Sequence, residues 1–255
     1  MIHLILTRFN LQYEADNRIG IEEQWLESRL KLFEQYCLPS IQKQTAADFI
    51  WLLLCNEETP KRYKQQLEEY KTRVPQLEIV YCEWIEDVNT LYHRIGQRYA
   101  KKGEILLTTR LDNDDRLSPA YIERVQEIAA EMSNGFISFP EGRQTFVRDH
   151  RSYRIRYIAN HFTTRIENTG YRTVLGFDHT RLTQQNDEVR IVDTQEEMWE
   201  ELVHGDNITN DYQPAFRYRI TSASDIADLS RRWWKFQTRR VYRLLKRLFV
   251  ASNQR

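Results

Sequence analysis

The stretch that decides the fold is ILLTTRLDNDDRLSP, Ile105 to Pro119, in which an apolar run leads straight into three aspartates and one asparagine, Asp112–Asp115. The apolar run has the composition of a buried strand, and Ser118 followed by Pro119 is a helix-start signal. Three carboxylates this close repel one another, so the arrangement is costly unless water, a cation or a cationic side chain compensates their charge. The stretch therefore predicts a strand that ends at a polar site.

Strand-like and helix-like segments alternate on the N-terminal side of this stretch. We expect strands over Ile2–Thr7, Asp48–Asn56, Leu77–Trp84 and Glu104–Leu111, and helices over Glu22–Tyr36, onward from Thr59 and Pro60, over Val88–Ala100, and from Ser118 to about Asn134. This order implies right-handed βαβ crossovers and a mostly parallel sheet through residues 1–135, with helices on both faces. Ligands of such sheets lie beyond the carboxyl ends of the strands. Three predicted strands end there in polar residues: Arg8–Asn10, Asn56–Glu58 and Asp112–Asp115.

The second half of the chain is less regular. Residues 135–149 and 153–166 have the short alternating patterns of antiparallel strands, and residues 171–182 predict a further strand. Gln195–Val203 predicts a helix that ends at His204 and Gly205. The fold class we expect is α/β, with a mostly parallel central sheet and a smaller antiparallel part.

Composition limits the classes of function. The chain has 255 residues, of which 41% are hydrophobic, and its 37 Lys and Arg balance 37 Asp and Glu. The balance is uneven, because residues 230–255 hold nine basic side chains and no acidic one. Three cysteines without C-x-x-C spacing argue against a disulfide or zinc framework. The first apolar run is too short for a signal peptide, and no stretch approaches the ~20 apolar residues of a membrane span. We expect a cytoplasmic protein that does not bind nucleic acid.

The basic tail predicts a separate element, residues 230–255. Trp234, Val241, Leu245 and Leu248 form an apolar helical stripe, and Arg and Lys cover the remaining face. We interpret the tail as an amphipathic helix that lies on the anionic inner face of the cell membrane, where each basic residue contributes about 1 kcal/mol. The alternative is a helix packed on the acidic body or on a partner subunit.

The acidic run has several possible chemistries. A solvated turn, in which Asp and Asn side chains bond nearby N–H groups, is the plainest. Asp112, Asp114 and Glu123 match three positions of an EF-hand calcium loop, but Arg116 and Leu117 stand where a ligand and a glycine are needed, which excludes that loop. Arg116 also replaces the hydroxyl residue of a dehalogenase-like phosphatase, so a metal-dependent phosphohydrolase is an alternative with less support.

A D-x-D metal site for a nucleoside diphosphate is the remaining reading of the acidic run. A hard divalent cation needs only one or two carboxylates when phosphate oxygens complete its shell. It would relieve the repulsion among the carboxylates and stabilise charge on a diphosphate leaving group. The position after the fourth strand of an α/β half favours this reading.

Four ordered blocks resemble one family. They are CLPSIQKQTAADFIWLLLCNEETP (37–60), LLTTRLDNDDRLSPAYI (106–122), YRTVLGFDHTRL (171–182) and MWEELVHGDNITN (198–210). Together they resemble the bacterial rhamnosyltransferase family within the GT-A glycosyltransferases, over roughly residues 1–215. The resemblance implies transfer of a sugar, with rhamnose suggested by the family name, from a nucleotide-sugar donor to a glycan or lipid-linked acceptor, with Mg²⁺ or Mn²⁺. It also implies one domain, residues 1–229, with a nucleotide-sugar half (1–135) and an acceptor half (136–229). A non-catalytic membrane adaptor on the same fold is a third hypothesis.

The resemblance also implies roles for individual residues. Asp112 and Asp114 match the D-x-D as metal ligands, with Asp114 the principal ligand and Asp112 nearer the ribose or the metal waters. His204 matches the late histidine that completes the metal site, although a histidine at a helix C-terminus is also ordinary. The residues expected to contact the nucleotide sugar are Arg8, Asn56, Arg110, Asp112 and Asp115. The catalytic base remains open among Glu141, Asp178 and Asp206.

Overall fold

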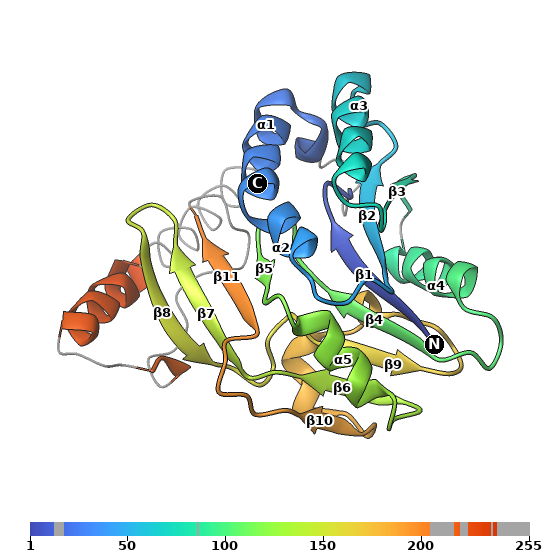
Figure 1. Ribbon diagram of the computed structural model, residues 1–255. Coiled ribbons are helices and arrows are strands. Elements are labelled where there is room, and N and C mark those ends of the chain that lie inside the picture. The colour runs from blue at the N-terminus through green and yellow to red at the C-terminus, as the bar shows by residue number, and fades with distance from the viewer. Residues whose placement is uncertain (13–17, 86, 205–216, 220–223, 236, 239–255) are drawn as a thin grey trace, which may run out of the picture. The chain divides into compact units, whose positions relative to one another are not determined.

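Seven strands form the central sheet of the computed structural model (Figure 1). Their order across the sheet is β10 (Val189–Ile191), β6 (Gly135–Ser138), β9 (Thr164–Glu167), β4 (Leu106–Arg110), β1 (Ile2–Arg8), β2 (Ile50–Asn56) and β3 (Leu77–Cys82). The neighbours β4, β1, β2 and β3 are parallel, as are β6 and β10, whereas β9 runs antiparallel to both β4 and β6. The predicted α/β class with a mostly parallel sheet is confirmed.

A second sheet of four strands and several helices complete the described structure. The second sheet has the order β5 (Arg116–Leu117), β11 (Trp199–Val203), β7 (Glu141–Phe146) and β8 (Arg151–Arg156). The helices are α1 (Glu23–Leu32), the π-helix η2 (Phe33–Cys37), α2 (Leu38–Gln42), α3 (Lys61–Glu69), α4 (Val88–Tyr99) and α5 (Tyr121–Ala129). The 3-10 turns are η1 (Ile19–Ile21), η3 (Tyr70–Thr72), η4 (Val174–Gly176) and η5 (His179–Gln184).

The structure describes residues 1–12, 18–85, 87–204, 217–219, 224–235 and 237–238. By its contacts the chain divides into two compact units. The first unit is Met1–Gly142 with Tyr157–Glu201, and the second is Arg143–Arg156 with Leu202–Arg255. The central sheet belongs to the first unit.

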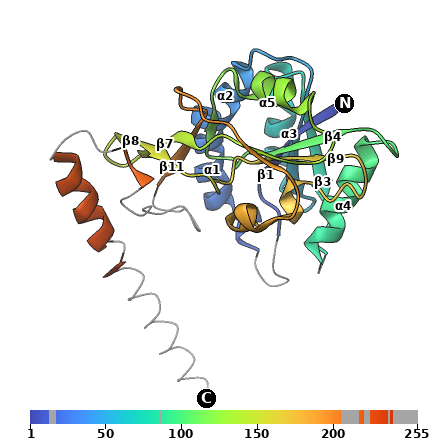
Figure 2. The same ribbon diagram turned by 90° about the horizontal axis from the view of Figure 1, so that it is seen from below.

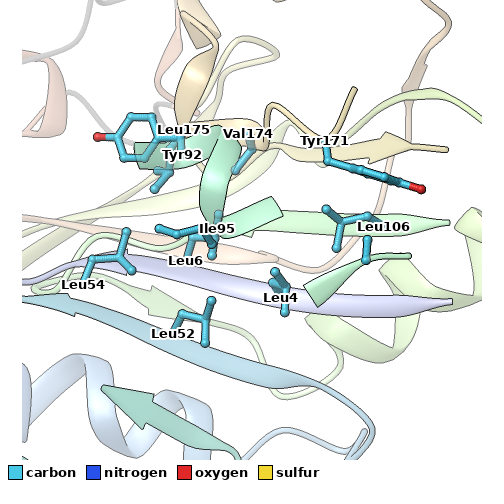
Figure 3. Packing of buried hydrophobic residues seen from close by; sticks show 11 residues of the cluster. Leu4, Leu6, Leu52, Leu54, Tyr92, Ile95, Leu106, Tyr171, Val174 and Leu175 are labelled. Atoms are coloured by element: carbon cyan, nitrogen blue, oxygen red, sulfur yellow. The ribbon is translucent and has the colours of Figure 1, made fainter. Parts of the chain in front are cut away.

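The core of the first unit lies on both faces of the central sheet. On one face, Leu4 and Leu6 of β1 pack with leucines of β2 against Tyr92 and Ile95 of α4 (Figure 3). On the other face, the indole of Trp51 stacks on Phe33 of η2, with 5.5 Å between ring centroids. Figure 2 shows α4 on one side of the sheet and α2 and α5 on the other. Burying each such apolar side chain contributes about 1.5–3 kcal/mol, which fixes the strands that carry the site.

Helix α5, which follows the acidic run, begins later than the sequence signal indicates. Ser118 and Pro119 were expected to start a helix, but α5 begins at Tyr121. The reason is tertiary, because the Ser118 N–H donates to the Met198 carbonyl at 2.9 Å and the Pro119 carbonyl accepts from the Thr45 N–H at 2.9 Å. These two residues are therefore held as a connection, and the helix starts only after them.

The strand expected over residues 171–182 is wrong. The segment forms η4 and η5 instead, because Tyr171 and Thr173 have positive φ angles of 48° and 63°, which no strand contains. The carboxylate of Glu167 stabilises this conformation by accepting from the N–H groups of Arg172 at 3.0 Å and Thr173 at 2.9 Å. A buried side-chain contact therefore outweighs the local strand pattern.

The helix expected over Gln195–Val203 is also wrong, since residues 199–203 form β11. Trp199 pairs with Leu117 across an antiparallel ladder and stacks on Phe162, with 4.9 Å between ring centroids. Gly142 leaves room for the indole, because a Cβ at that position would lie 2.3 Å from the Trp199 ring. The burial of the Trp199 side chain thus outweighs the helical propensity of the neighbouring glutamates.

Part of the basic tail is described, and it belongs to the second unit. Residues 224–235 are helical. The helix packs on that unit through Asp228, which accepts from the Tyr153 hydroxyl at 2.6 Å, and through Arg232, whose guanidinium lies 4.2 Å from the Phe146 ring centroid. Among the described helices, none has the length and apolar character needed to cross a membrane. The other predicted stripe residues lie outside the described residues: Val241, Leu245 and Leu248.

Candidate functional site

The parallel strands bring polar residues together at their carboxyl ends. Asn10 follows β1 and Asn56 ends β2; the Asn56 N–H donates to the Asn10 carboxamide oxygen at 3.1 Å. The Asn10 amide also donates to the Thr59 hydroxyl at 2.9 Å. The Asn56 carboxamide oxygen is itself used, because it accepts from the Glu58 N–H at 2.8 Å. Asn56 therefore lies at the predicted edge but helps to build the loop there.

The acidic run Asp112–Asp115 follows β4 and forms a turn. Its backbone closes through the Asp115 N–H, which donates to the Asp112 carbonyl at 3.2 Å. The buried Asn113 side chain fixes the turn to the neighbouring strand, since its amide donates to the Phe9 carbonyl at 2.7 Å and the Arg8 carbonyl at 3.1 Å. The turn is therefore held against the end of β1.

Asp112 forms the outer side of this turn. Arg110 contacts it in a bidentate manner, with Nε 2.9 Å from Oδ1 and Nη2 2.7 Å from Oδ2, and Arg8 Nη2 lies 3.6 Å from Oδ1. The three side chains keep 16–25% of their surface exposed. Burial on its own raises the pKa of the Asp112 carboxyl, but the guanidiniums of Arg110 and Arg8 outweigh it and hold that pKa well below its usual value. Asp112 is therefore ionised and strongly compensated.

Asp114 forms the inner side of the turn with Arg29. Arg29 Nη1 lies 2.8 Å from Asp114 Oδ2 and 3.2 Å from the Asn113 carboxamide oxygen. The side chains of Arg29 and Asp114 are only 10% and 7% exposed. The guanidinium also lies over the Trp25 ring, 5.1 Å from its centroid. The carboxylate of Asp114, the second aspartate of the D-x-D, is therefore part of a buried ion pair.

Asp115 is fully buried and contacts His161. The distance from His161 Nε2 to Asp115 Oδ2 is 2.7 Å, and to Asp112 Oδ2 it is 4.0 Å. The sheet register explains this meeting, because Thr109 of β4 pairs with Thr164 of the antiparallel β9. Continuing that register by three residues brings Asp112 opposite His161. Burial lowers the pKa of His161 below its usual value, so the ring is neutral at pH 7.

The ligand atoms of Asp112, Asp115 and His161 all lie within 4.8 Å of one another. Two carboxylates and a neutral imidazole are a donor set that divalent metal ions accept, and a histidine must be neutral to be a ligand. The residues present therefore fit a divalent cation. The ring centroid of His179 lies 6.0 Å from that of His161, and burial lowers the pKa of His179 to about 4.

The structure brings together four of the predicted donor-site residues. Arg8, Arg110, Asp112 and Asp115 meet at the turn, whereas Asp114 turns to Arg29. Of the remaining metal candidates, His204 follows β11 in the second unit. The three-ligand group contains His161 instead.

The three candidate bases have different surroundings. Glu141 is 3% exposed at the start of β7. Asp178 is exposed and caps η5, where it accepts from the Thr180 N–H at 3.0 Å and from the Thr180 hydroxyl at 2.7 Å. Those hydrogen bonds lower the pKa of the Asp178 carboxyl. Asp206 lies outside the described residues.

Two residues of the site, Arg29 and His161, were not predicted. Arg29 carried a usable signal, because it lies on the same helical stripe as Leu26 and Leu30, and all three are buried in α1. A charged residue on an apolar stripe needs a partner. His161 had a weaker signal, since its place opposite Asp112 depends on the antiparallel insertion of β9, which the sequence pattern does not specify.

Comparison with known proteins identifies the family. Residues 7–215 match the model of the family described as "Putative rhamnosyl transferase". The first part of TarS from S. aureus, in complex with UDP, has a similar structure with a TM-score of 0.48 and 10% identity, covering 80% of this chain and 61% of that one. The mannosyltransferase PcManGT from Pyrobaculum calidifontis gives a TM-score of 0.35 and 14% identity, covering 53% and 34%.

This chain thus spans about three fifths of the TarS chain that it matches, and no curated protein matches it. The family match covers most of the chain, including the acidic turn and the two arginines that contact Asp112, Arg8 and Arg110. The chain belongs to the family described as "Putative rhamnosyl transferase".

Proposed function

We propose that this glycosyltransferase uses a nucleoside diphosphate sugar as donor and binds its diphosphate at the acidic turn. The observation that carries the proposal is the meeting of two guanidiniums, from Arg8 and Arg110, with the ligand group of Asp112, Asp115 and His161. Guanidiniums bind phosphate oxygens in bidentate geometry, and carboxylates bind the cation that accompanies a diphosphate. One edge of the sheet thus offers both kinds of contact.

The proposed roles of the chain's own residues follow from their present contacts. Arg110 and Arg8 both contact the Asp112 carboxylate. A cation on Asp112 would compete with the arginines for that carboxylate and let them turn to phosphate oxygens. The bound Mg²⁺ or Mn²⁺ would neutralise charge that develops on the diphosphate leaving group. An imidazole ligand such as His161 favours a first-row transition ion, so we expect Mn²⁺ to bind more tightly than Mg²⁺.

The acceptor side of the proposal is less specified. We infer a glycan or lipid-linked acceptor, with a carboxylate that removes the proton of its hydroxyl. Glu141, Asp178 and Asp206 remain candidates for that base, and the capping hydrogen bonds of Asp178 to Thr180 disfavour it because they lower its basicity. Rhamnose is the transferred sugar that the family description suggests.

The experiment is a thermal-shift and calorimetric screen of UDP-, GDP- and dTDP-linked sugars with Mn²⁺. A ligand of the native state raises the melting temperature, and at a hundredfold excess over Kd it contributes about 2.7 kcal/mol. Asp112→Asn should lose this stabilisation, whereas Asp178→Asn, which alters an exposed carboxylate, should keep it. If no nucleotide sugar binds with Mn²⁺ present, the proposal fails. Release of phosphate from an aryl phosphate, without sugar transfer, would favour the phosphohydrolase instead.

We also propose that the tail helix binds an anionic membrane surface. Support comes from the described part of the helix, where the indoles of Trp233 and Trp234 are 40% and 64% exposed and Ile226 is 54% exposed. Asp228 and Arg232 face the body of the second unit, so the aromatic side chains point away from it. Exposed tryptophans next to many basic residues are typical of helices that lie in a membrane interface.

Vesicle sedimentation tests this membrane proposal. Trp233→Ala with Trp234→Ala should reduce binding to vesicles that contain anionic lipid, while neutral vesicles should bind the native chain weakly. The matched control is Trp84→Ala, because Trp84 is 41% exposed but lies after β3. Equal sedimentation of all three proteins would reject the proposal.

A further inference from the structure

We propose that His179 binds a hydroxyl group of the donor's sugar and so helps to decide which sugar the protein accepts. This inference rests on the proposed function and extends it from the diphosphate to the sugar. His179 is the first residue of η5, and its side chain is partly exposed. Within the described part of the chain, its ring makes no hydrogen bond and no ion pair. The imidazole therefore has ring nitrogens that the fold itself does not use.

A strap, residues 171–179, carries this ring to the ligand edge of the central sheet. The strap begins at the opposite edge, where the Tyr171 hydroxyl lies 3.0 Å from the carbonyl oxygen of Glu104, just before β4. It then crosses the face of the sheet, because the Val174 N–H donates to the hydroxyl of Thr108 in the middle of β4 at 2.8 Å. The strap therefore runs in the direction of β4 and reaches the carboxyl end of that strand.

The far end of the strap lies beside the acidic turn. Phe177 packs on Phe136 of β6, with 4.6 Å between ring centroids, and this contact fixes the chain two residues before His179. The ring of His179 then stands edge-on to that of His161, with 6.0 Å between centroids and 74° between the ring planes. His161 contacts Asp115 of the acidic turn at 2.7 Å. His179 is thus a more exposed imidazole next to the proposed diphosphate site.

The order of the strands indicates which part of the donor would meet His179. Along the ligand edge, Asn56 ends β2, Arg8 ends β1, Arg110 ends β4, and His161 precedes β9, which neighbours β4 on the side away from β1. The proposed diphosphate lies between the two arginines. The nucleoside and the sugar are attached to opposite ends of the diphosphate, so one points toward β2 and the other toward β9. With the nucleoside on the side of Asn56, the sugar lies on the side of His179.

The chemistry of the ring fits a hydroxyl group. A histidine is mostly neutral at pH 7 even at its ordinary pKa of about 6.5, and burial lowers the pKa of His179 to about 4. A neutral imidazole donates one hydrogen bond and accepts another, as a hydroxyl also does. It carries no positive charge for a phosphate. A site that hydrogen-bonds a substrate hydroxyl discriminates against sugars that lack it or hold it in another orientation.

The test is calorimetry on the full chain with Mn²⁺ present. It uses two ligands: the member of the UDP-, GDP- and dTDP-sugar series that binds best, and the same nucleoside diphosphate without its sugar. His179→Ala should weaken binding of the nucleotide sugar by about tenfold, as expected for the loss of a hydrogen bond to a ligand. Binding of the nucleoside diphosphate should stay within about twofold, because its contacts are unchanged. His179→Asn keeps a donor and an acceptor and should recover most of the lost affinity.

The matched control is Thr183→Ala, an exposed position on the same 3-10 helix, which should bind both ligands as the native chain does. If His179→Ala does not fold, His179→Phe replaces it, since a phenyl ring keeps the bulk and removes both nitrogens. Equal weakening of both ligands, or no weakening of the nucleotide sugar, overturns the inference alone. A native chain that binds neither ligand overturns the proposed function and the inference with it.

Discussion

The two sides of the acidic turn differ in what compensates their charge. On the inner side, Asp114 pairs with Arg29, and both side chains are at most 10% exposed. On the outer side, Asp112 pairs with Arg8 and Arg110, and all three keep 16–25% of their side-chain surface exposed. The same short sequence thus holds one carboxylate in a buried ion pair and another in a partly exposed cluster of charges.

The largest expected effect lies on the inner side. Arg29→Gln removes the guanidinium that lies 2.8 Å from the buried Asp114 carboxylate, so we expect the free energy of unfolding to fall by about 3–5 kcal/mol. Urea unfolding followed by circular dichroism measures this change. The control is Arg62→Gln, because Arg62 pairs with Glu23 and Glu27 at the surface, where an ion pair contributes about 1 kcal/mol or less. If the two variants lost similar amounts of free energy of unfolding, the buried Arg29–Asp114 pair would contribute no more than the exposed pairs of Arg62.

An intermediate effect is expected at His3, near the N-terminal end of β1. His3 is buried beside Thr109, with 2.8 Å between Nε2 and the hydroxyl oxygen, and burial lowers its pKa to about 3. In the unfolded chain the pKa is about 6.5, so between these two values the unfolded state binds more protons than the folded state. The free energy of unfolding should therefore fall as the pH is lowered from about 6.5 toward about 3, by at most about 1.4 kcal/mol per pH unit.

Denaturant titrations of the native chain and His3→Gln across this pH range measure that contribution. The native chain should lose more stability on acidification than the variant does. Equal slopes would show that His3 takes up no proton on unfolding. His179, whose pKa is lowered to about 4, contributes in the same direction in both proteins and therefore cancels in the comparison.

The smallest expected effect lies on the outer side. Arg110→Gln should change the free energy of unfolding by about 1 kcal/mol, because Arg8 still compensates Asp112. It should weaken binding of a nucleotide sugar by about tenfold, which corresponds to about 1.4 kcal/mol. Calorimetry with Mn²⁺ present measures this affinity. Arg165→Gln is the matched control: that side chain is equally exposed at 16%, but it pairs with Glu167 on β9. Donor binding that weakens equally in both variants would contradict the role of Arg110.

The parallel half of the fold could be predicted because each strand there is a local apolar run followed by a helix. The expected strands Ile2–Thr7 and Asp48–Asn56 match β1 and β2 closely, and the expected helix over Val88–Ala100 matches α4. The strands and helices of the second half were harder to predict, because they depend on contacts with residues that are distant in the sequence. Residues 199–203 become β11 only because Trp199 is buried against Phe162 and Gly142.

The residues of the candidate site also divide into those that the sequence predicted and those that it did not. The sequence predicted Arg8, Arg110, Asp112 and Asp115, since polar residues after parallel strands must meet at one edge. It did not predict Arg29, although its place on an apolar stripe of α1 was visible. It named His204 as a metal candidate and did not name His161, whose ring nitrogen lies in the three-ligand group. His161 lies in the turn before the antiparallel strand β9, and no local pattern separates it from any other turn residue.

By itself the sequence determined that a buried strand delivers three carboxylates to the ligand edge of a parallel sheet, because strand composition and βαβ order are local properties. Only the tertiary structure decided which cationic or imidazole group each carboxylate meets. Arg29 reaches Asp114 across 85 residues, and His161 reaches Asp115 across 46. Such contacts depend on helix packing and on the register of β9 against β4, which no short segment encodes, and they decide which partner each aspartate of the turn contacts.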